Sequence, residues 1–322
     1  MCTAISKHGA RHLFGRTLDL ECSYGEESVI APRNFCFDFL YEAGSISHYA
    51  IMGIACVRDE VPLFYDAVNE RGLAIAGLNF PGNAVYRERI DGMYNVAPYE
   101  FISWLLSRCD SVSSAVELLK NVNIIQADFS AELPSTPLHW LIADKYGSIT
   151  AEPIKSGLKI YENPFGVLTN NPEFSYHITN LSNYVQMRAE PPENSLCPSV
   201  ELERYSRGLG AIGLPGDYSS PSRFVRAVFA KNHTVCEEGN EVTELFHIMD
   251  AVSQPRGCVV TDRGDPVSTV YTSCADTQAG AYYFTTHGNR RIRAMKFDTD
   301  VLNSASLIKY SMDNNEDILY LN

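Results

Sequence analysis

The sequence has too little positive charge for a protein that binds nucleic acid. Its 322 residues include 26 lysines and arginines against 39 aspartates and glutamates, which gives a net charge of −13. A surface of that sign repels phosphate backbones. We therefore expect no nucleic-acid partner.

Long apolar segments are also missing. The longest, at residues 50–57, is far shorter than the roughly 20 residues with which a helix crosses a bilayer. The first residues lack the apolar core of a signal peptide. We expect a soluble, cytoplasmic protein with no membrane partner.

Linkers and repeats are absent as well. No Pro- or Ser-rich tract, low-complexity segment or internal repeat interrupts the sequence. The composition, with 45% hydrophobic and 20% charged residues, is that of a globular protein with a large core. We therefore predict one domain over residues 1–322.

The cysteines do not form a pattern typical of disulfides or zinc sites. Their number is odd, their spacings are wide and no Cys-x-x-Cys pair occurs. Most have apolar neighbours in the sequence, so we expect inert core residues. The nine are Cys2, Cys22, Cys36, Cys56, Cys109, Cys197, Cys236, Cys258 and Cys274.

What is present is an alternation of strand-like and helical blocks. Short strand-like segments, among them 35–41, fill the first eighty residues, and apolar residues then recur at helical spacing over 98–108 and 112–119. Strands resume over 138–168, helices over 222–231 and 242–252, and strands close the chain. This order indicates an α+β fold with helices covering sheets. An αββα sandwich fits, although periodicity alone does not select it over other layered folds.

Cys2 stands apart by its position. If Met1 is removed, Cys2 carries a thiol with an ordinary pKa of about 8.5 and an α-amine with one of about 8, so one residue can supply both nucleophile and general base. The eight histidines are then expected to be structural. Position alone favours a different interpretation, a solvent-facing or packed residue at the start of a strand. A hairpin would bring Arg16 and Asp19 beside Cys2, where the cation favours thiolate and the carboxylate holds the amine.

Several motifs, taken together, are more specific. In this order along the whole chain, they resemble those of the choloylglycine hydrolase family, which contains bile salt hydrolases and penicillin V acylases. They are Met-Cys-Thr-Ala at 1–4, Phe-Gly-Arg-Thr-Leu-Asp at 14–19, Gly-Leu-Asn-Phe-Pro-Gly at 77–82, Leu-His-Trp at 138–140, Leu-Thr-Asn-Asn-Pro at 168–172, Gly-Leu-Pro-Gly-Asp at 213–217 and Ser-Arg-Phe at 222–224.

The resemblance implies a four-layer αββα sandwich of the N-terminal nucleophile hydrolase type. It implies Cys2 as nucleophile and base, Arg16 and Asp19 as residues that orient it, and Arg223 as a further active-site arginine. Asn170 takes the place of the family's oxyanion-hole asparagine, with a second contribution from Asn79. No metal or organic cofactor is implied.

The resemblance also implies a substrate. Asn79 matches the bile salt hydrolase form of the family, which favours conjugated bile salts, and overlap with penicillin V is plausible. The steroid would contact an apolar wall made of Leu18, Tyr65, Phe129, Leu133 and Leu138. Arg207 lies in a loop similar to those associated with taurine conjugates. The family further implies a homotetramer with 188–210 as an intersubunit loop.

Three alternatives remain at this point. Two are amidases, namely a penicillin V acylase and an N-acyl homoserine lactone acylase. The third belongs to another class, a catalytically dead protein that binds steroids. The intact set of Cys2, Arg16, Asp19, Asn79, Asn170 and Arg223 argues against the third.

Overall fold

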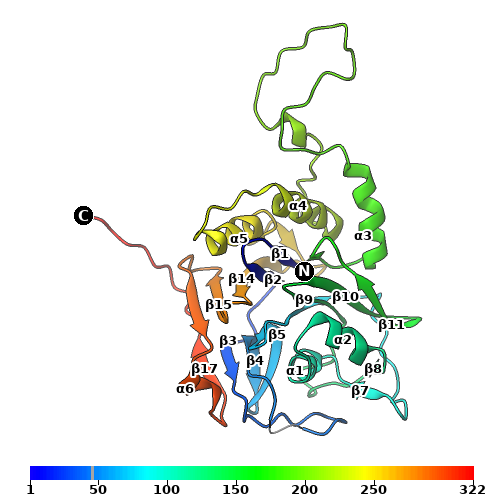
Figure 1. The fold of residues 1–322 in the computed structure, drawn as a ribbon, viewed down its shortest axis with the longest axis vertical. Helices are drawn as coiled ribbons and strands as arrows, with labels where there is room; N and C mark the ends of the chain where they lie inside the picture. The colour runs from blue at the N-terminus through cyan, green and yellow to red at the C-terminus, as the bar shows by residue number, and fades with distance from the viewer. Residues whose placement is uncertain (45–46) are drawn as a thin grey trace.

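The computed structural model describes residues 1–44 and 47–322, and its core is a pair of stacked β-sheets (Figure 1). Over these residues the first sheet has seven strands in the order β12-β1-β2-β14-β15-β16, with β13 attached to β14. The strands are β1 (Cys2–His8), β2 (His12–Leu20), β12 (Val167–Leu168), β13 (Val259–Val260), β14 (Pro266–Asp276), β15 (Ala281–Thr286) and β16 (Arg293–Lys296).

The second sheet, counted over the same residues, has eight strands in the order β11-β10-β9-β6-β5-β4-β3-β17. They are β3 (Glu26–Ala31), β4 (Ile51–Arg58), β5 (Val61–Asn69), β6 (Ala74–Asn79), β9 (Leu138–Asp144), β10 (Gly147–Ile154), β11 (Gly157–Glu162) and β17 (Ile308–Ser311). A separate parallel pair consists of β7 (Tyr94–Val96) and β8 (Val122–Ile124).

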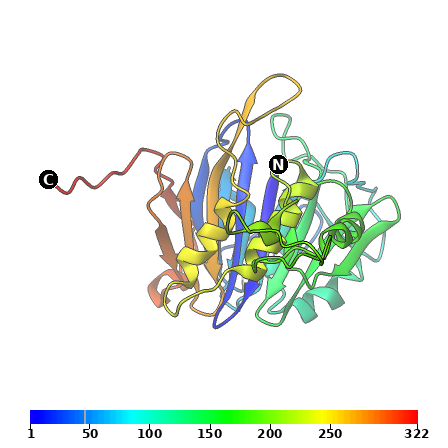
Figure 2. The same ribbon diagram turned by 90° about the horizontal axis from the view of Figure 1, so that it is seen from above.

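Helices cover the outer faces of both sheets. Figure 1 shows α4 and α5 above the first sheet and α1 and α2 below the second, and Figure 2 shows α4 and α5 crossing the first sheet from above. The helical bounds are α1 (Phe101–Leu106), α2 (Val112–Leu119), α3 (Phe174–Leu181), α4 (Ser220–His233), α5 (Glu241–Asp250) and α6 (Thr299–Leu302), with short 3₁₀ turns η1 (Ser182–Tyr184) and η2 (Leu209–Ala211).

Two apolar clusters account for this layering. One joins side chains of the first sheet, such as Ile5 and Phe14, to Phe224 of α4 and to Leu141 of the second sheet. The other packs the far face of the second sheet against α1 and α2 and includes the fully buried Trp104. The predicted four-layer αββα arrangement is confirmed.

The strands that carry the site are buried on both faces. Eight of the nine residues of β2 are buried, because helices cover one face of this sheet and the second sheet covers the other. Gly15 is required within β2, since a Cβ there would lie 2.3 Å from the Ser273 carbonyl oxygen and 3.0 Å from Leu245. Close packing at Gly15 therefore fixes the strand beside Arg16.

The strand expected at 35–41 is wrong. Phe37 and Phe39 alternate with exposed residues and are buried, with their rings stacked at 5.5 Å, but the backbone forms no strand ladder. The alternation of apolar and polar residues indicates which side chains are buried. An extended loop that lies on the core produces this pattern as well as a strand does.

The expectation that most cysteines lie in the core is also wrong. All nine are free, and those that are buried are Cys2, Cys56, Cys109 and Cys274. Cys36 shows the reason, because it points outward between the inward-facing Phe35 and Phe37. Apolar neighbours in the sequence therefore do not indicate burial in an extended segment.

Residues 188–210 leave the body of the molecule. Figure 1 shows this segment as a long loop that projects beyond α3 and α4 at the top of the view, while the C-terminal residues extend away at the left. Apolar side chains in this loop are exposed, with 93% of Leu196 and 85% of Tyr205 accessible.

Candidate active site

Cys2 begins β1 and lies inside the molecule, with 2% of its surface exposed. It pairs with Leu18 of β2, and two residues further along, Ala4 pairs with Leu168 of β12. Continuing the second register beyond the end of β12 brings Asn170 opposite Cys2. The Cys2 amide N–H donates to Asn170 Oδ1 at 2.8 Å.

Arg223 reaches this point from the first turn of α4 and is completely buried. Its Nη1 donates to the Cys2 carbonyl and, at 2.7 Å, to Thr3 Oγ1, and its Nη2 donates to Asn170 Oδ1 at 2.6 Å. Burial lowers the pKa of Arg223, while the charges of Asp19 and Cys2 act in the opposite direction. The guanidinium thus ties the start of β1 to Asn170.

Arg16, on β2, occupies the layer between the two sheets. Its Nη1 donates to the Tyr65 carbonyl at 2.9 Å and to the Gly77 carbonyl at 2.8 Å. Burial works against its charge, but the negative groups around it, Cys2 foremost, raise its pKa. Its Nη2 is buried without a hydrogen-bond partner in the described part of the chain. That nitrogen is a free donor within the site.

Asp19 is buried at the end of β2 that faces Cys2. Its carboxylate accepts from Thr269 Oγ1 at 2.7 Å, Gln254 Nε2 at 3.1 Å and Thr17 Oγ1 at 3.3 Å. Burial raises the pKa of Asp19, against the effect of Arg223 and the chain terminus. The Met1 amine donates to the Asp19 main-chain oxygen at 2.6 Å rather than to its carboxylate.

The two asparagines meet through one contact. Asn170 Nδ2 donates to the Asn79 main-chain oxygen at 2.7 Å, so Asn79 holds Asn170 with its backbone. The Asn79 side-chain oxygen is buried without a partner in the described residues. Asn170 therefore contacts Cys2, Arg223 and Asn79 at once.

The apolar residues expected to contact the substrate lie in four places. Leu18 is buried opposite Cys2, and Leu138 of β9 is half-buried opposite Asn79 of β6. Tyr65 is half-buried on β5, and its carbonyl holds Arg16. Phe129 and Leu133 lie at the two ends of a short loop, where the Phe129 N–H donates to the Leu133 carbonyl at 3.2 Å.

The structure does not bring Arg207 to this cluster. It is exposed, and it belongs to the loop that projects from the body (Figure 1).

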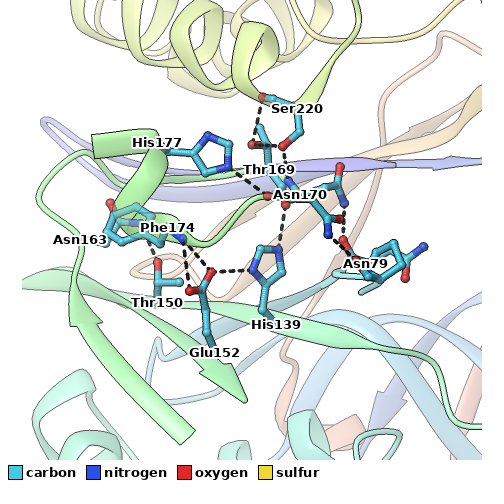
Figure 3. Close-up of polar contacts among 12 residues, drawn as sticks. Asn79, His139, Thr150, Glu152, Asn163, Thr169, Asn170, Phe174, His177 and Ser220 are labelled. Carbon is cyan, nitrogen blue, oxygen red and sulfur yellow. Dashed lines mark hydrogen bonds and ion pairs between the residues drawn. The ribbon is translucent and has the colours of Figure 1, made fainter. Parts of the chain in front are cut away.

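Sequence reasoning missed the buried polar groups behind these residues. Asp66 lies near Arg16 and accepts from the hydroxyls of Tyr271, Tyr282 and Ser273. His139 and Glu152 bond to each other beneath Asn170 (Figure 3). Asp66 meets partners that lie more than 200 residues away in the sequence. His139 belongs to the Leu-His-Trp motif, but its bond to Glu152 forms only when β9 pairs with β10.

Two searches of the described residues are negative. Residues 1–44 and 47–322 contain no cluster of three or more His, Cys, Asp or Glu side chains that could hold a metal ion. In the same part of the chain, no helix has the length and apolar character needed to cross a membrane.

Comparisons with known proteins agree with this geometry. A family model for linear amide C–N hydrolases, the choloylglycine hydrolase family, matches residues 2–310. A bile salt hydrolase/transferase from Lactiplantibacillus plantarum is 44% identical over 97% of both chains. Another from Clostridium perfringens is 35% identical over the full length of both.

Solved structures give the same result. A variant of the conjugated bile acid hydrolase from Clostridium perfringens matches with a TM-score of 0.93 at 35% identity, covering all of both chains. A penicillin V acylase from Agrobacterium tumefaciens shares the fold, with a TM-score of 0.77 at 20% identity over 96% of this chain and 90% of that one. The fold is that of the N-terminal nucleophile hydrolases, and the chain belongs to the choloylglycine hydrolase family, whose members are amidases that cleave linear amides.

Proposed function

We propose that this protein hydrolyses the amide bond of glycine- or taurine-conjugated bile salts to free bile acid and amino acid. One observation carries the proposal, namely that the nitrogen of the buried Cys2 is already bound by Asn170 Oδ1 at 2.8 Å. The two bile salt hydrolase/transferases and the conjugated bile acid hydrolase named above act on bile salts or conjugated bile acids according to their names.

Removal of Met1 would turn the Cys2 nitrogen into a primary amine at the place where Asn170 holds it. The amine then takes the thiol proton, and the sulfur attacks the amide carbonyl carbon. The resulting ammonium gives its proton to the leaving nitrogen as the C–N bond breaks, which releases glycine or taurine and leaves a thioester. A water molecule, deprotonated by the same amine, cleaves the thioester and frees the bile acid and the thiol.

The other site residues have electrostatic roles in this proposal. We assign the unpaired Arg16 Nη2 to the negative charge that develops first on sulfur and then on the carbonyl oxygen, since Cys2 is the negative group that acts most strongly on this guanidinium. Asn170 Nδ2 has a second hydrogen beyond the one given to Asn79, and we assign it to the oxyanion together with a contribution from Asn79. Arg223 and Asp19 keep Cys2 and Asn170 in place.

The steroid would lie against Leu18, Tyr65, Phe129, Leu133 and Leu138. A wall of this kind also fits the phenoxyacetyl group of penicillin V, so we propose weaker activity on that substrate. The preference for bile salts rests on Asn79 and on the 44% identity to a bile salt hydrolase/transferase.

Acyl transfer follows from the same intermediate. Two of the relatives are named hydrolase/transferase. An amine that replaces water would attack the thioester carbon and lose a proton to the Cys2 amine. The new C–N bond replaces the C–S bond, and the proton then passes to sulfur, which restores the Cys2 thiol. Incubation with a conjugate and an excess of a second amine tests this by mass spectrometry of the new amide.

We also propose that residues 1–322 form one catalytic domain that assembles as a homotetramer through the 188–210 loop. The exposed Leu196 and Tyr205 on that loop support burial against another subunit.

The test is incubation with glycocholate, taurocholate, penicillin V and an N-acyl homoserine lactone, each followed by release of the free amine. The fastest release should come from a bile salt. If penicillin V or the lactone were cleaved fastest, the protein would instead be a penicillin V acylase or an N-acyl homoserine lactone acylase. Steroid binding with no release from any substrate would indicate the catalytically dead protein.

A further inference from the structure

Side chains hold three backbone groups at and beside Asn170 (Figure 3). The Asn170 N–H donates to Ser220 Oγ at 2.8 Å, and the Asn170 carbonyl accepts from His177 Nε2 at 3.0 Å. The preceding carbonyl, that of Thr169, accepts from His139 Nε2 at 3.0 Å. Three side chains from β9, α3 and α4 therefore determine where the Asn170 backbone lies.

His139 is fixed in turn by Glu152. The strands β9 and β10 pair with Trp140 opposite Ala151, and continuing that register brings His139 opposite Glu152. His139 Nδ1 lies 3.0 Å from Glu152 Oε1, and both side chains have no exposed surface. Phe80 stacks on the imidazole at 4.1 Å with an angle of 8° between the rings, which fixes the ring plane.

Glu152 also holds the segment on the other side of Asn170. Its two carboxylate oxygens accept from the Phe174 N–H, at 3.1 and 3.2 Å, where α3 begins. A negative charge at a helix N-terminus is favourable. The pair thus fastens the chain at Thr169 and again at Phe174, with Asn170 between these two points.

The proton positions follow from the partners. A carbonyl only accepts, so His139 Nε2 carries a hydrogen. One further proton lies between Nδ1 and Glu152 Oε1, because two facing lone pairs at 3.0 Å would repel. Whichever atom holds it, the pair has no net charge, which suits its complete burial.

We propose that His139 and Glu152 are positioning residues for the reaction, which hold Asn170 at the distance from Cys2 that the chemistry requires. The inference rests on the proposed function of Asn170. Neither side chain contacts Cys2, so the pair acts through the Thr169 carbonyl and the start of α3.

The test is a double-mutant cycle with Asn170. His139→Leu should lower kcat on glycocholate roughly 10- to 100-fold, because a shift of about 1 Å at a catalytic group costs on that order. KM should change by less than about 3-fold. In an Asn170→Ala background the same substitution should have almost no further effect, since the group that it displaces is gone. His139→Gln places an amide donor near the former Nε2 and should recover much of the rate.

The matched control is His12→Leu. His12 is another buried histidine with two hydrogen bonds, to Ser6 Oγ and Thr277 Oγ1, both at 2.9 Å, but it lies at the far end of the β1–β2 hairpin from Cys2. It should lower the thermal midpoint while leaving kcat of the folded protein unchanged.

Three outcomes would overturn the inference: an unchanged kcat in His139→Leu, an equal loss in both backgrounds, or an equal loss of kcat in His12→Leu. If His139→Leu does not fold, His139→Asn replaces it in the cycle, since the shorter amide still meets Glu152 but does not reach Thr169. A wild-type protein that releases no amine from any bile salt would refute the proposed function instead.

Discussion

Retention of Met1 should abolish catalysis without unfolding the protein. With Met1 in place, its amine donates to the Asp19 carbonyl at 2.6 Å and its carbonyl accepts from the Asp19 N–H at 2.9 Å, which extends the β1–β2 ladder by one residue. The Cys2 nitrogen is then an amide and has no basic lone pair. The fold tolerates Met1, but the proposed mechanism does not.

The magnitude follows from these contacts. A positioned general base contributes roughly 10²- to 10⁴-fold to a rate, so kcat should fall by about that factor. Each backbone hydrogen bond contributes about 0.5–1.5 kcal/mol, so the two bonds to Asp19 should make the Met1 form more stable by roughly 1–3 kcal/mol. Activity and stability are therefore expected to change in opposite directions.

The assay compares two forms of one protein, released from the same N-terminal fusion by proteolysis either before Met1 or before Cys2. Intact mass identifies each form, glycine release from glycocholate gives kcat, and urea unfolding gives the free energy of unfolding. Mixtures of the two forms should have activity in proportion to the Cys2 form. Equal kcat for the two pure forms would refute the role of the α-amine.

Three further predictions concern the nucleophile, the amino-acid end of the substrate and the pH dependence of stability. Cys2→Ser should lose roughly 10³-fold or more in kcat, because an α-amine with a pKa of about 8 does not deprotonate an alcohol effectively; inactivation by iodoacetamide at any other cysteine would contradict this. Arg207→Ala should lower kcat/KM for taurocholate more than for glycocholate, by roughly 1–2 kcal/mol for a lost charged hydrogen bond, and equal losses on both conjugates would remove Arg207 from specificity. Burial lowers the pKa of His12 to about 3, below its unfolded value of about 6.5. Between these two pH values the unfolded chain binds a proton that the folded protein does not, so the free energy of unfolding falls as the pH falls from 6.5 to about 3. Between pH 6.5 and 4 the wild type should thus lose more unfolding free energy than His12→Gln, by up to about 1.4 kcal/mol per pH unit in urea titrations, and parallel curves would contradict the assignment.

The parts of the site that local sequence could predict are those joined by one hairpin. Arg16 and Asp19 follow Cys2 within seventeen residues, and two strands with a short turn bring them back beside it. Asn170 and Arg223 are different, because they meet Cys2 through the order of strands in the sheet and through the placement of α4. Periodicity does not encode that order, so only the family motifs predicted their place.

The burial of charged and polar side chains was the feature least predictable from the sequence. His139 and Glu152 are ordinary residues of two alternating strands until β9 and β10 pair, and Asp66 gains its three hydroxyl partners only from β14 and β15. The cysteines show a related limit, since apolar neighbours in the sequence predicted that most of them lie in the core, whereas the extended backbone turns Cys36 outward. Asp66 meets its partners across 205 or more residues of sequence, whereas His139 and Glu152 lie only 13 residues apart, and in both cases the contact depends on how strands pair.

These long-range contacts explain how the site can hold four ionisable side chains that water barely reaches. Arg16 and Arg223 oppose Asp19 and Asp66, and each has an exposed fraction of 1% or less. Two positive and two negative groups leave no net charge, which burial would otherwise make costly. Within the described residues, 1–44 and 47–322, no direct ion pair joins these four side chains. The guanidiniums donate to backbone carbonyls, Asn170 and Thr3, and the carboxylates accept from hydroxyls and Gln254.

The electric field of these separated charges persists when a new charge forms during the reaction. Transfer of the Cys2 proton to its own amine adds one positive and one negative group, so the total stays at zero while the fixed groups need not move. Asp66→Asn would leave the shape of the site unchanged but would remove one negative charge beside Arg16. Its cost would therefore fall on the rate of acylation rather than on KM, because the field matters most where charge develops and least where the neutral amide binds.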